Sequence, residues 1–278
     1  MVFGKADKAL MQAWDEAVDL ATSEVEERGY AVVGEGNLIA QSGILEDIST
    51  EHSSTIIGVQ HLAEGYIGCN VKMQGSIISE HFIVEDDTHL GNCSLQHCYV
   101  GEGCRLDGGF SAHDSLIFAN SNLSNGEASA AFLGPYTVSM HRSTLLIGGA
   151  FSFFNAGSGT NQSNHQYRLG PIHHGLMERG VKYSSDSYML WPARVGAFSK
   201  LVGRFYRHPD TAELPFAVLT SDGGEMQIQP AVTIGHIGTW RDFEKWPLRD
   251  NRTSTLPDDR LVFRLWQPAI MYRVWQGW

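Results

Sequence analysis

The chain has 278 residues, of which 42% are hydrophobic and 18% are charged, a composition typical of one or two globular domains rather than of a disordered chain. Its 31 acidic and 20 basic side chains give a formal net charge of −11, which argues against nucleic-acid or membrane partners held by bulk charge. The four cysteines follow no CxxC or zinc-ribbon spacing, and no apolar leader or membrane span is recognisable. We therefore expect a cytoplasmic protein.

Residues 1–30 are expected to form an amphipathic helix that ends near Gly29. Apolar residues recur there at helical spacing, at Leu10, Trp14, Val18, Ala21 and Val25. Such a stripe normally packs against a larger body, and this is the expected role. Recognition of a partner is the alternative.

Residues 31–154 repeat with a period of 16 or 17 residues. Five segments align: IGCNVKM at 67, VEDDTHL at 84, VGEGCRL at 100, IFANSNL at 117 and LGPYTVS at 133. In each segment the first position is aliphatic, the fifth is small or β-branched, and the seventh is apolar in four of the five. This pattern is typical of stacked coils of short strands that share one apolar interior. VGAFSKL at 195 fits the same pattern and predicts a last coil.

The repeat resembles the hexapeptide pattern of the left-handed parallel β-helix superfamily, which includes the hexapeptide-repeat acyltransferases. A second likeness spans about residues 30–250, where GPYTV, STLLI and RHPDTAELPF are similar to an uncharacterised bacterial family of unknown function built on the same helix. These resemblances imply an all-β fold, a left-handed parallel β-helix. Because hexapeptide proteins usually associate with parallel axes, they also imply a homotrimer. They leave the cofactor unknown.

The motif SAHDS, at residues 111–115, is similar to the Ala-His-Asp of UDP-N-acetylglucosamine acyltransferases. In those enzymes the histidine is the general base that deprotonates a sugar hydroxyl. The resemblance implies this catalytic role for His113, with Asp114 as its neighbour. An imidazole beside a carboxylate on a rigid coil suits such base catalysis.

His81, His97 and His113 are each sixteen residues apart. One coil separates them, so they are expected to stack along one edge of the helix at about 4.8 Å. Stacked imidazoles can bind a metal ion. The gamma-class carbonic anhydrases, which share this fold, use a histidine pair at i and i+5 that is absent here. A surface ladder without metal is therefore the expectation.

Residues 155–194 lose the aliphatic period, and we expect them to leave the coil as a long polar excursion that holds an anionic or sugar-containing ligand. The ligand-binding candidates are Arg142, Asn161, Asn164, His165, Arg168, His174, Arg179 and Asp186, and the catalytic candidates beside His113 are His141 and His173. His141 and Arg142 precede the excursion and are expected to share its cleft, where arginines would hold a phosphate or carboxylate. A loop that packs on the helix wall without a ligand is the alternative.

Residues 195–278 contain the last coil and then gain aromatic residues. Five of the seven tryptophans lie in the last 39 residues, at Trp240, Trp246, Trp266, Trp275 and Trp278. They are expected to cap the exposed end of the β-helix, with carbohydrate stacking as the alternative.

Two classes of function follow from these features. One is a transferase-like enzyme that acts on a sugar or nucleotide-sugar with a histidine base. The other is a non-catalytic binding or scaffold protein that holds an anionic ligand or a protein partner. Whether the protein is an enzyme stays open at this point.

Overall fold

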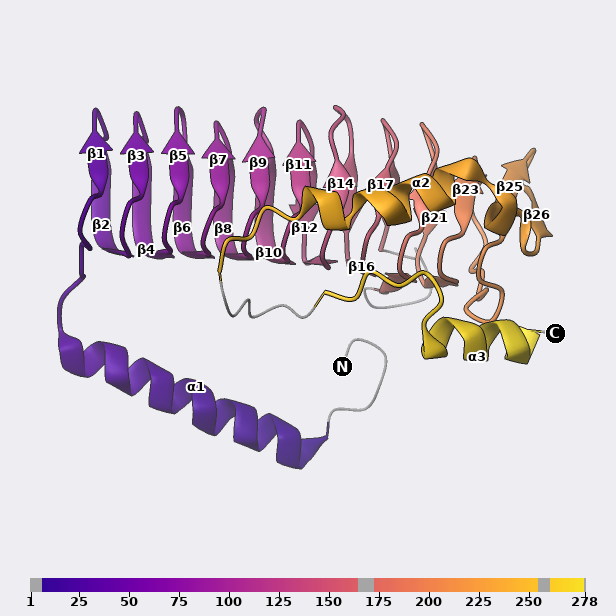
Figure 1. The fold of residues 1–278 in the computed structure, drawn as a ribbon, viewed down its shortest axis with the longest axis horizontal. Helices are drawn as coiled ribbons and strands as arrows, with labels where there is room; N and C mark the ends of the chain where they lie inside the picture. The colour runs from indigo at the N-terminus through magenta and orange to yellow at the C-terminus, as the bar shows by residue number, and fades with distance from the viewer. Residues whose placement is uncertain (1–6, 165–172, 255–260, 278) are drawn as a thin grey trace.

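The computed structural model describes residues 7–164, 173–254 and 261–277. It is a parallel β-solenoid of about 10 turns, preceded by helix α1 (Lys8–Arg28) and followed by a helical, aromatic-rich region (Figure 1). The prediction of a parallel β-helix is thereby confirmed. No helix among the described residues is long and apolar enough to cross a membrane.

The strands form three sheets that run along the solenoid. In spatial order, the first contains β1 (Leu38–Ala40), β3 (Thr55–Ile57), β5 (Lys72–Gln74), β7 (His89–Gly91), β9 (Arg105–Asp107), β11 (Asn122–Ser124), β14 (Val138–Ser139), β17 (Asn155–Ala156), β20 (Lys182–Tyr183), β23 (Lys200–Val202), β25 (Val218–Asp222) and β26 (Glu225–Gln229). The second contains β2 (Ile44–Thr50), β4 (His61–Ile67), β6 (Ile78–Val84), β8 (Ser94–Val100), β10 (Ser111–Ile117), β13 (Phe132–Leu133), β16 (Gly149–Phe151), β19 (Gly175–Met177) and β22 (Ala193–Val195), with β12 (Glu127–Ser129) pairing with β10 and β15 (Leu145–Ile147). The third contains β18 (Asn161–Ser163), β21 (Tyr188–Leu190) and β24 (Arg204–Phe205).

Each early turn has three sides, because its longest strand is bent at the centre. The fourth residue of each seven-residue strand has a positive φ and takes no part in the strand pairing. These residues form the central corner column, which consists of Asp47, Glu64, His81, His97 and Asp114. A second corner column of positive φ contains Ser53, Asn70, Asp87, Gly103, Asn120, Tyr136 and Phe153. The corners are the tight turns that the repeat predicted between short strands. They determine which side chains point outwards.

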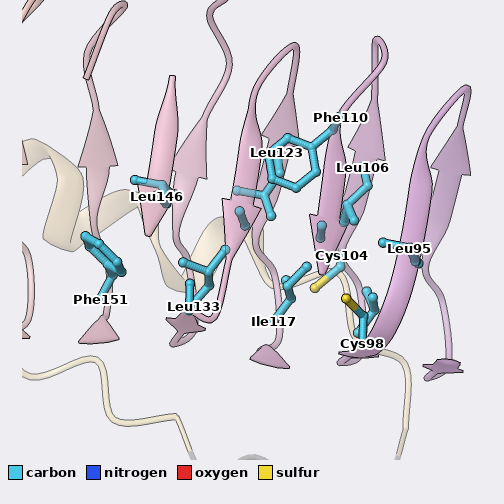
Figure 2. Close-up of a cluster of buried hydrophobic side chains, with 14 of the residues drawn as sticks. Leu95, Cys98, Cys104, Leu106, Phe110, Ile117, Leu123, Leu133, Leu146 and Phe151 are labelled. Atoms are coloured by element: carbon cyan, nitrogen blue, oxygen red, sulfur yellow. The ribbon is translucent and has the colours of Figure 1, made fainter. Parts of the chain in front are cut away.

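The repeat positions fill the interior of the solenoid. The first positions lie in register and are fully buried, at Ile67, Val84, Val100, Ile117 and Leu133. Figure 2 shows Ile117 and Leu133 of this row among the buried side chains of successive turns. Hydroxyls at the fifth position satisfy backbone carbonyls beside the corner: Thr88 Oγ1 donates to the Gly101 carbonyl at 2.9 Å, and Thr137 Oγ1 to that of Gly134 at 2.7 Å. This position is small because it is buried beside the corner, where a larger side chain would not fit.

The prediction that residues 155–194 leave the coil is wrong for the described part of that segment. The strands β17 to β22 lie within it, and they pair in parallel with the turns on either side. Gly149 pairs with Gly175 at an interval of 26 residues, so this turn contains an insertion, and beside it the backbone N–H of His173 donates to the carbonyl of Asn164 at 2.8 Å. His165 and Arg168 lie outside the described residues.

An unusual interior residue helps to explain why the aliphatic period is not recognisable in the sequence of this segment. Trp191 is fully buried, and its Nε1 donates to the carbonyl of Ile147 at 2.7 Å. Gly175 makes room for it, since a Cβ at this position would lie 2.2 Å from the indole ring. One tryptophan and a facing glycine therefore fill interior space here, beside the buried Met177 and Val195.

The C-terminal region caps the last turn and also runs back along the solenoid. The antiparallel strand β26 covers the edge of β25. Three short helices and helical turns follow, η1 (Val232–Gly235), α2 (Ile237–Lys245) and η2 (Pro247–Arg249), and α3 (Pro268–Gly277) lies near the end of the chain. After η2 the chain reaches earlier turns, where Asp250 Oδ1 accepts from Asn120 Nδ2 at 2.8 Å and Thr253 N donates to Asp87 Oδ2 at 2.8 Å. Figure 1 shows this segment beside turns far from it in sequence.

Helix α1 begins at an N-cap, where the Asp7 carboxylate accepts from the N–H of Ala9, and it ends at Gly29 with a left-handed φ of 67°. The predicted helix is confirmed over its described residues. The expected packing of its apolar stripe is wrong, since Leu10, Trp14 and Val18 are exposed. The stripe faces solvent because the link to the first turn carries α1 away from the solenoid (Figure 1).

Candidate functional site

His113 lies on the outer face of β10, one position before the central corner. It pairs in register with Gln96 of β8 and Ser129 of β12, whereas Asp114 occupies the corner itself. The predicted ladder of three histidines is therefore right for His81 and His97, whose rings stack with centroids 4.8 Å apart, and wrong for His113. The interval between corner residues is sixteen from His81 to His97 but seventeen from His97 to Asp114, which shifts His113 into the neighbouring row.

A cavity of about 310 Å³ opens on the outer face beside His113. Alternation along each strand turns every second side chain outwards, and parallel register aligns these side chains across β6, β8 and β10. The small side chains of Ser94 and Ser111 leave a depression between larger neighbours. The other lining residues are Ile78, Glu80, Leu95, Gln96, Ala112 and His113.

A second cavity, of about 410 Å³, adjoins the first and shares Ser111 with it. Its other lining residues are Gly108, Gly109, Asn125, Gly126, Glu127, Arg142, Ser143 and Thr144. Gly109 adopts a φ of 83° with open space around its Cα, so the bend, rather than crowding, requires glycine here. We call the two cavities together the face groove.

The face groove brings an imidazole, a carboxylate and a guanidinium to one surface. His113 Nε2 lies 3.8 Å from Glu127 Oε1, and the two side chains are 46% and 49% exposed. Arg142 is exposed, and no hydrogen bond or ion pair engages its guanidinium within the described parts of the chain. A carboxylate beside Nε2 stabilises an imidazolium and leaves Nδ1 to accept a proton. The unpaired guanidinium is suited to bind a phosphate or carboxylate.

The other predicted residues near the third sheet lie outside the face groove. His141 is exposed next to Arg142, and its carbonyl accepts from Thr144 Oγ1 at 3.0 Å. Asn161 is exposed in β18. Asp186 forms an ion pair with Arg204, with 2.6 Å between Oδ1 and Nη2, and the guanidinium holds the pKa of this exposed carboxyl below its ordinary value.

Arg179 is a structural residue in this arrangement. Its guanidinium lies 3.6 Å from the centre of the Phe153 ring, its Nη2 donates to the carbonyl of Val262, and burial lowers its pKa to about 10. The C-terminal region thus covers the cation that was expected to bind a ligand. Its stack on aromatic rings replaces the carboxylate that buried arginines usually require.

The predicted residues that flank the insertion also lie outside the face groove. His173 is half-buried, and its Nε2 has no hydrogen-bond partner among the described residues, whereas His174 is exposed. Asn164 is half-buried at the other end of the insertion. None of them lines the cavity that contains Arg142, so a shared cleft of these residues with His141 and Arg142 is not found in the described chain.

Sequence reasoning found His113 and Arg142 but missed the residues that surround them. Glu80, Gln96 and His113 follow one another at intervals of 16 and 17, as do Ser94, Ser111 and Glu127 at 17 and 16. The coil period places these residues on neighbouring turns, but because the interval alternates between 16 and 17 it does not say which row each side chain joins.

The whole chain, residues 1–278, matches the profile of a domain of unknown function, DUF4954. The chain belongs to the DUF4954 family. No curated protein matches it. This match agrees with the resemblance to an uncharacterised bacterial family, and it assigns no activity. The function of this protein has to be argued from the face groove, because one fold supports many chemistries.

Proposed function

We propose that this DUF4954 protein is a group transferase that binds a sugar or nucleotide-sugar in the face groove and uses His113 as general base. The observation that carries the proposal is the imidazole of His113 in a cavity on the outer face, with the Glu127 carboxylate 3.8 Å from Nε2. Nδ1 takes the proton of a sugar hydroxyl, and the hydroxyl oxygen bonds to the acyl carbon of a thioester donor as the carbon–sulfur bond breaks. Glu127 stabilises the resulting imidazolium, which then gives its proton to the leaving thiolate.

The lining of the face groove supports a sugar-containing ligand with an anionic group. Hydroxyl and amide side chains from Ser94, Gln96, Ser111 and Asn125 can donate to and accept from sugar hydroxyls. In a chain with a net charge of −11, an anion needs a local cation, and Arg142 supplies one. The rigid parallel strands hold these groups in place before the ligand arrives.

The test combines binding with turnover. Binding of UDP-N-acetylglucosamine is measured by calorimetry, and release of free thiol from acetyl-coenzyme A is followed in the presence of a panel of nucleotide-sugars. We expect His113→Asn to lower the rate of transfer by about 100-fold or more while binding is retained, since a general base contributes about 10²–10⁴-fold. Arg142→Gln should instead weaken binding by about 10-fold.

Matched controls are His208→Asn and Arg207→Gln, which change exposed residues outside the face groove. Both are expected to behave as the wild type. Transfer that persists in His113→Asn would refute the catalytic role. Binding that depends on Arg142 without transfer to any acceptor would favour the alternative, a non-catalytic protein that holds an anionic ligand.

We also propose that the protein associates as a homotrimer. An outward row of apolar residues runs across five turns in register, at Tyr66, Ile83, Tyr99, Leu116 and Phe132. Ile83, Leu116 and Phe132 are each at least 40% exposed. A row that follows the solenoid axis suits association of copies with parallel axes, because each turn then meets its equivalent.

A further inference from the structure

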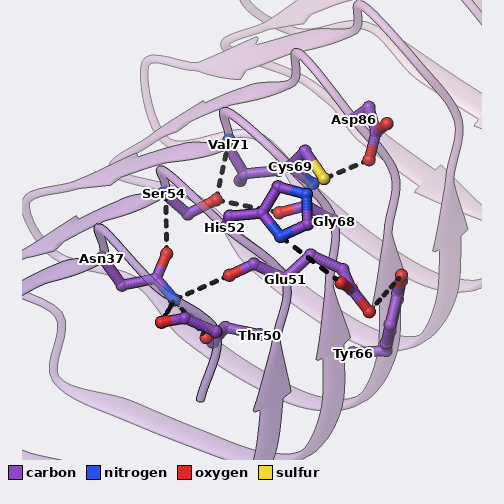
Figure 3. Close-up of polar contacts among 11 residues, drawn as sticks. Asn37, Thr50, Glu51, His52, Ser54, Tyr66, Gly68, Cys69, Val71 and Asp86 are labelled. Carbon is purple, nitrogen blue, oxygen red and sulfur yellow. Dashed lines mark hydrogen bonds and ion pairs between the residues drawn. The ribbon is translucent and has the colours of Figure 1, made fainter. Parts of the chain in front are cut away.

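Three different potential metal ligands meet beside the second corner column in the first turns (Figure 3). Glu51 and His52 follow β2, and Cys69 follows β4 one turn later. A carboxylate oxygen of Glu51, a ring nitrogen of His52 and Sγ of Cys69 all lie within 4.8 Å of one another. None of these three residues lines the face groove.

The register between adjacent turns of the solenoid brings these three side chains together. Thr50 pairs with Ile67, which places His52 beside Cys69 on adjacent turns. The backbone there is pinned, since Glu51 N donates to the Ile67 carbonyl at 2.8 Å. Cys69 N donates to Asp86 Oδ1 at 2.7 Å. The ligands therefore extend from fixed positions, which reduces the entropy lost when they close on an ion.

One carboxylate oxygen of the cluster is also oriented by a neighbouring side chain. Tyr66 donates its hydroxyl to Glu51 Oε1 at 3.4 Å, and Glu51 Oε2 lies 3.8 Å from His52 Nδ1. The two oxygens thus have separate roles, because Tyr66 holds one while the other faces the imidazole. Such an outer contact to a ligating carboxylate is usual around protein-bound metals.

The surroundings of the cluster are strongly acidic. Burial, together with the charges of Glu51, Glu85 and Asp86, raises the pKa of Tyr66 to about 12. Asp87 lies next to these residues, and no cationic side chain is among the groups that act on Tyr66 or Cys69. An excess of negative charge at this place attracts a cation.

We propose that Glu51, His52 and Cys69 bind a zinc ion, with the fourth coordination position open to solvent. A set of one thiolate, one imidazole and one carboxylate suits zinc, whereas calcium and magnesium require oxygen ligands. Zinc–ligand bonds of about 2.0–2.3 Å require only small rotations of the side chains from their present separation. The side chains of His52 and Glu51 are 65% and 45% exposed, so a metal ion can reach them directly from solvent.

The experiment uses the full chain, stripped of metal with a chelator. Zinc affinity and stoichiometry are measured by competition with a chromophoric chelator, and cobalt is added separately as a spectroscopic probe. The wild type should bind one equivalent and show the near-ultraviolet absorption of a cobalt–thiolate bond. Cys69→Ser should lose that absorption and bind zinc about 100-fold more weakly or worse, and His52→Gln should also weaken binding.

The control variants are Cys98→Ser and His208→Gln, which make the same chemical changes away from the cluster. Both should bind zinc and cobalt as the wild type does. If Cys69→Ser keeps the wild-type affinity and the cobalt absorption, the proposal is overturned.

A second measurement uses the wild-type protein and therefore does not depend on whether a variant folds. Cys69 is half-buried, while Cys93, Cys98 and Cys104 are buried, so iodoacetamide should modify Cys69 first in the native protein. One equivalent of zinc should slow that alkylation by at least about 10-fold, because the metal-bound thiolate is no longer free to react. An unchanged rate would reject the site.

Discussion

The imidazole rings of His81 and His97 stack at the central corner, with their centroids 4.8 Å apart and their planes inclined by 19°. A carboxylate stands at each end of this pair. Glu64 Oε2 lies 2.9 Å from His81 Nδ1, and Asp114 Oδ1 lies 3.4 Å from His97 Nδ1. Four successive corner residues thus form one outward ladder, in which each histidine has a carboxylate beside it.

The ladder predicts a measurable coupling between its two histidines. In a double-mutant cycle of His81→Ala and His97→Ala, we expect a coupling energy of about 0.2–1 kcal/mol in the free energy of unfolding, because half-exposed neighbours on adjacent strands interact weakly. Chemical denaturation supplies the values. The cycle of His81→Ala with His113→Ala should give a coupling near zero, since His113 belongs to the neighbouring row. Equal coupling in both cycles would contradict the register.

A second prediction concerns the packing of Trp191. Gly175→Ala should lower the free energy of unfolding by about 1–3 kcal/mol or more, since the new methyl group would lie 2.2 Å from the buried indole. Gly235→Ala in η1 is the matched control. Like Gly175, Gly235 does not have a positive φ, and a Cβ at this position would meet no atom within 4 Å, so little loss of stability is expected. Similar losses in the two variants would show that the indole is not crowded.

A third prediction concerns the acid sensitivity of the C-terminal segment. Hydrogen bonds from the Arg252 guanidinium, assisted by Asn120, hold the pKa of Asp250 below its ordinary value. A carboxyl whose pKa is lowered by folding stabilises the protein above its unfolded pKa and loses this contribution as pH falls through the folded value. Wild-type stability should therefore fall below about pH 4 partly through Asp250.

The matched variant is Asp250→Asn, which keeps the size of the side chain and removes its titration. It should be less stable than the wild type at pH 7, and the difference between the two melting temperatures should shrink from pH 7 to pH 2. Limited proteolysis after residue 246 reports release of the segment directly. A difference that stays constant with pH would exclude the titration of Asp250 as the cause.

A fourth prediction tests the proposed homotrimer. Phe132→Glu places a charge in the outward apolar row of Leu116 and Phe132 and should dissociate the oligomer, because an interface does not readily bury an unpaired carboxylate. Light scattering at micromolar concentration gives the molar mass. Lys200→Glu, an exposed change on the first sheet, should leave it unchanged. A wild-type monomer would disprove the association, and a trimer that survives Phe132→Glu would place the interface elsewhere.

The architecture of the solenoid was predictable because its repeat is a local chemical signal. Aliphatic residues such as Val100 and hydroxyl residues such as Thr88 recur in phase because each turn fills its interior and its corner in the same way. The repeat could not be recognised where a turn fills its interior with other residues. Trp191 with Gly175 fills the interior without the aliphatic pattern, and the insertion between Asn164 and His173 breaks the interval, so paired strands were predicted as an excursion.

The candidate site depended on something the sequence alone does not contain. His113 and Arg142 stood out by residue type and motif, but Glu127 became a partner of His113 only through the parallel register of β10 with β12. Likewise, Arg179 is of a residue type that often binds anions, but the distant C-terminal segment returns to it and half-buries it. The sequence by itself determined the stacked turns, since aliphatic and small residues recur along the chain every 16 or 17 positions. Tertiary structure alone decided which side chains meet, because one residue of difference between intervals of 16 and 17 moves a side chain to another row.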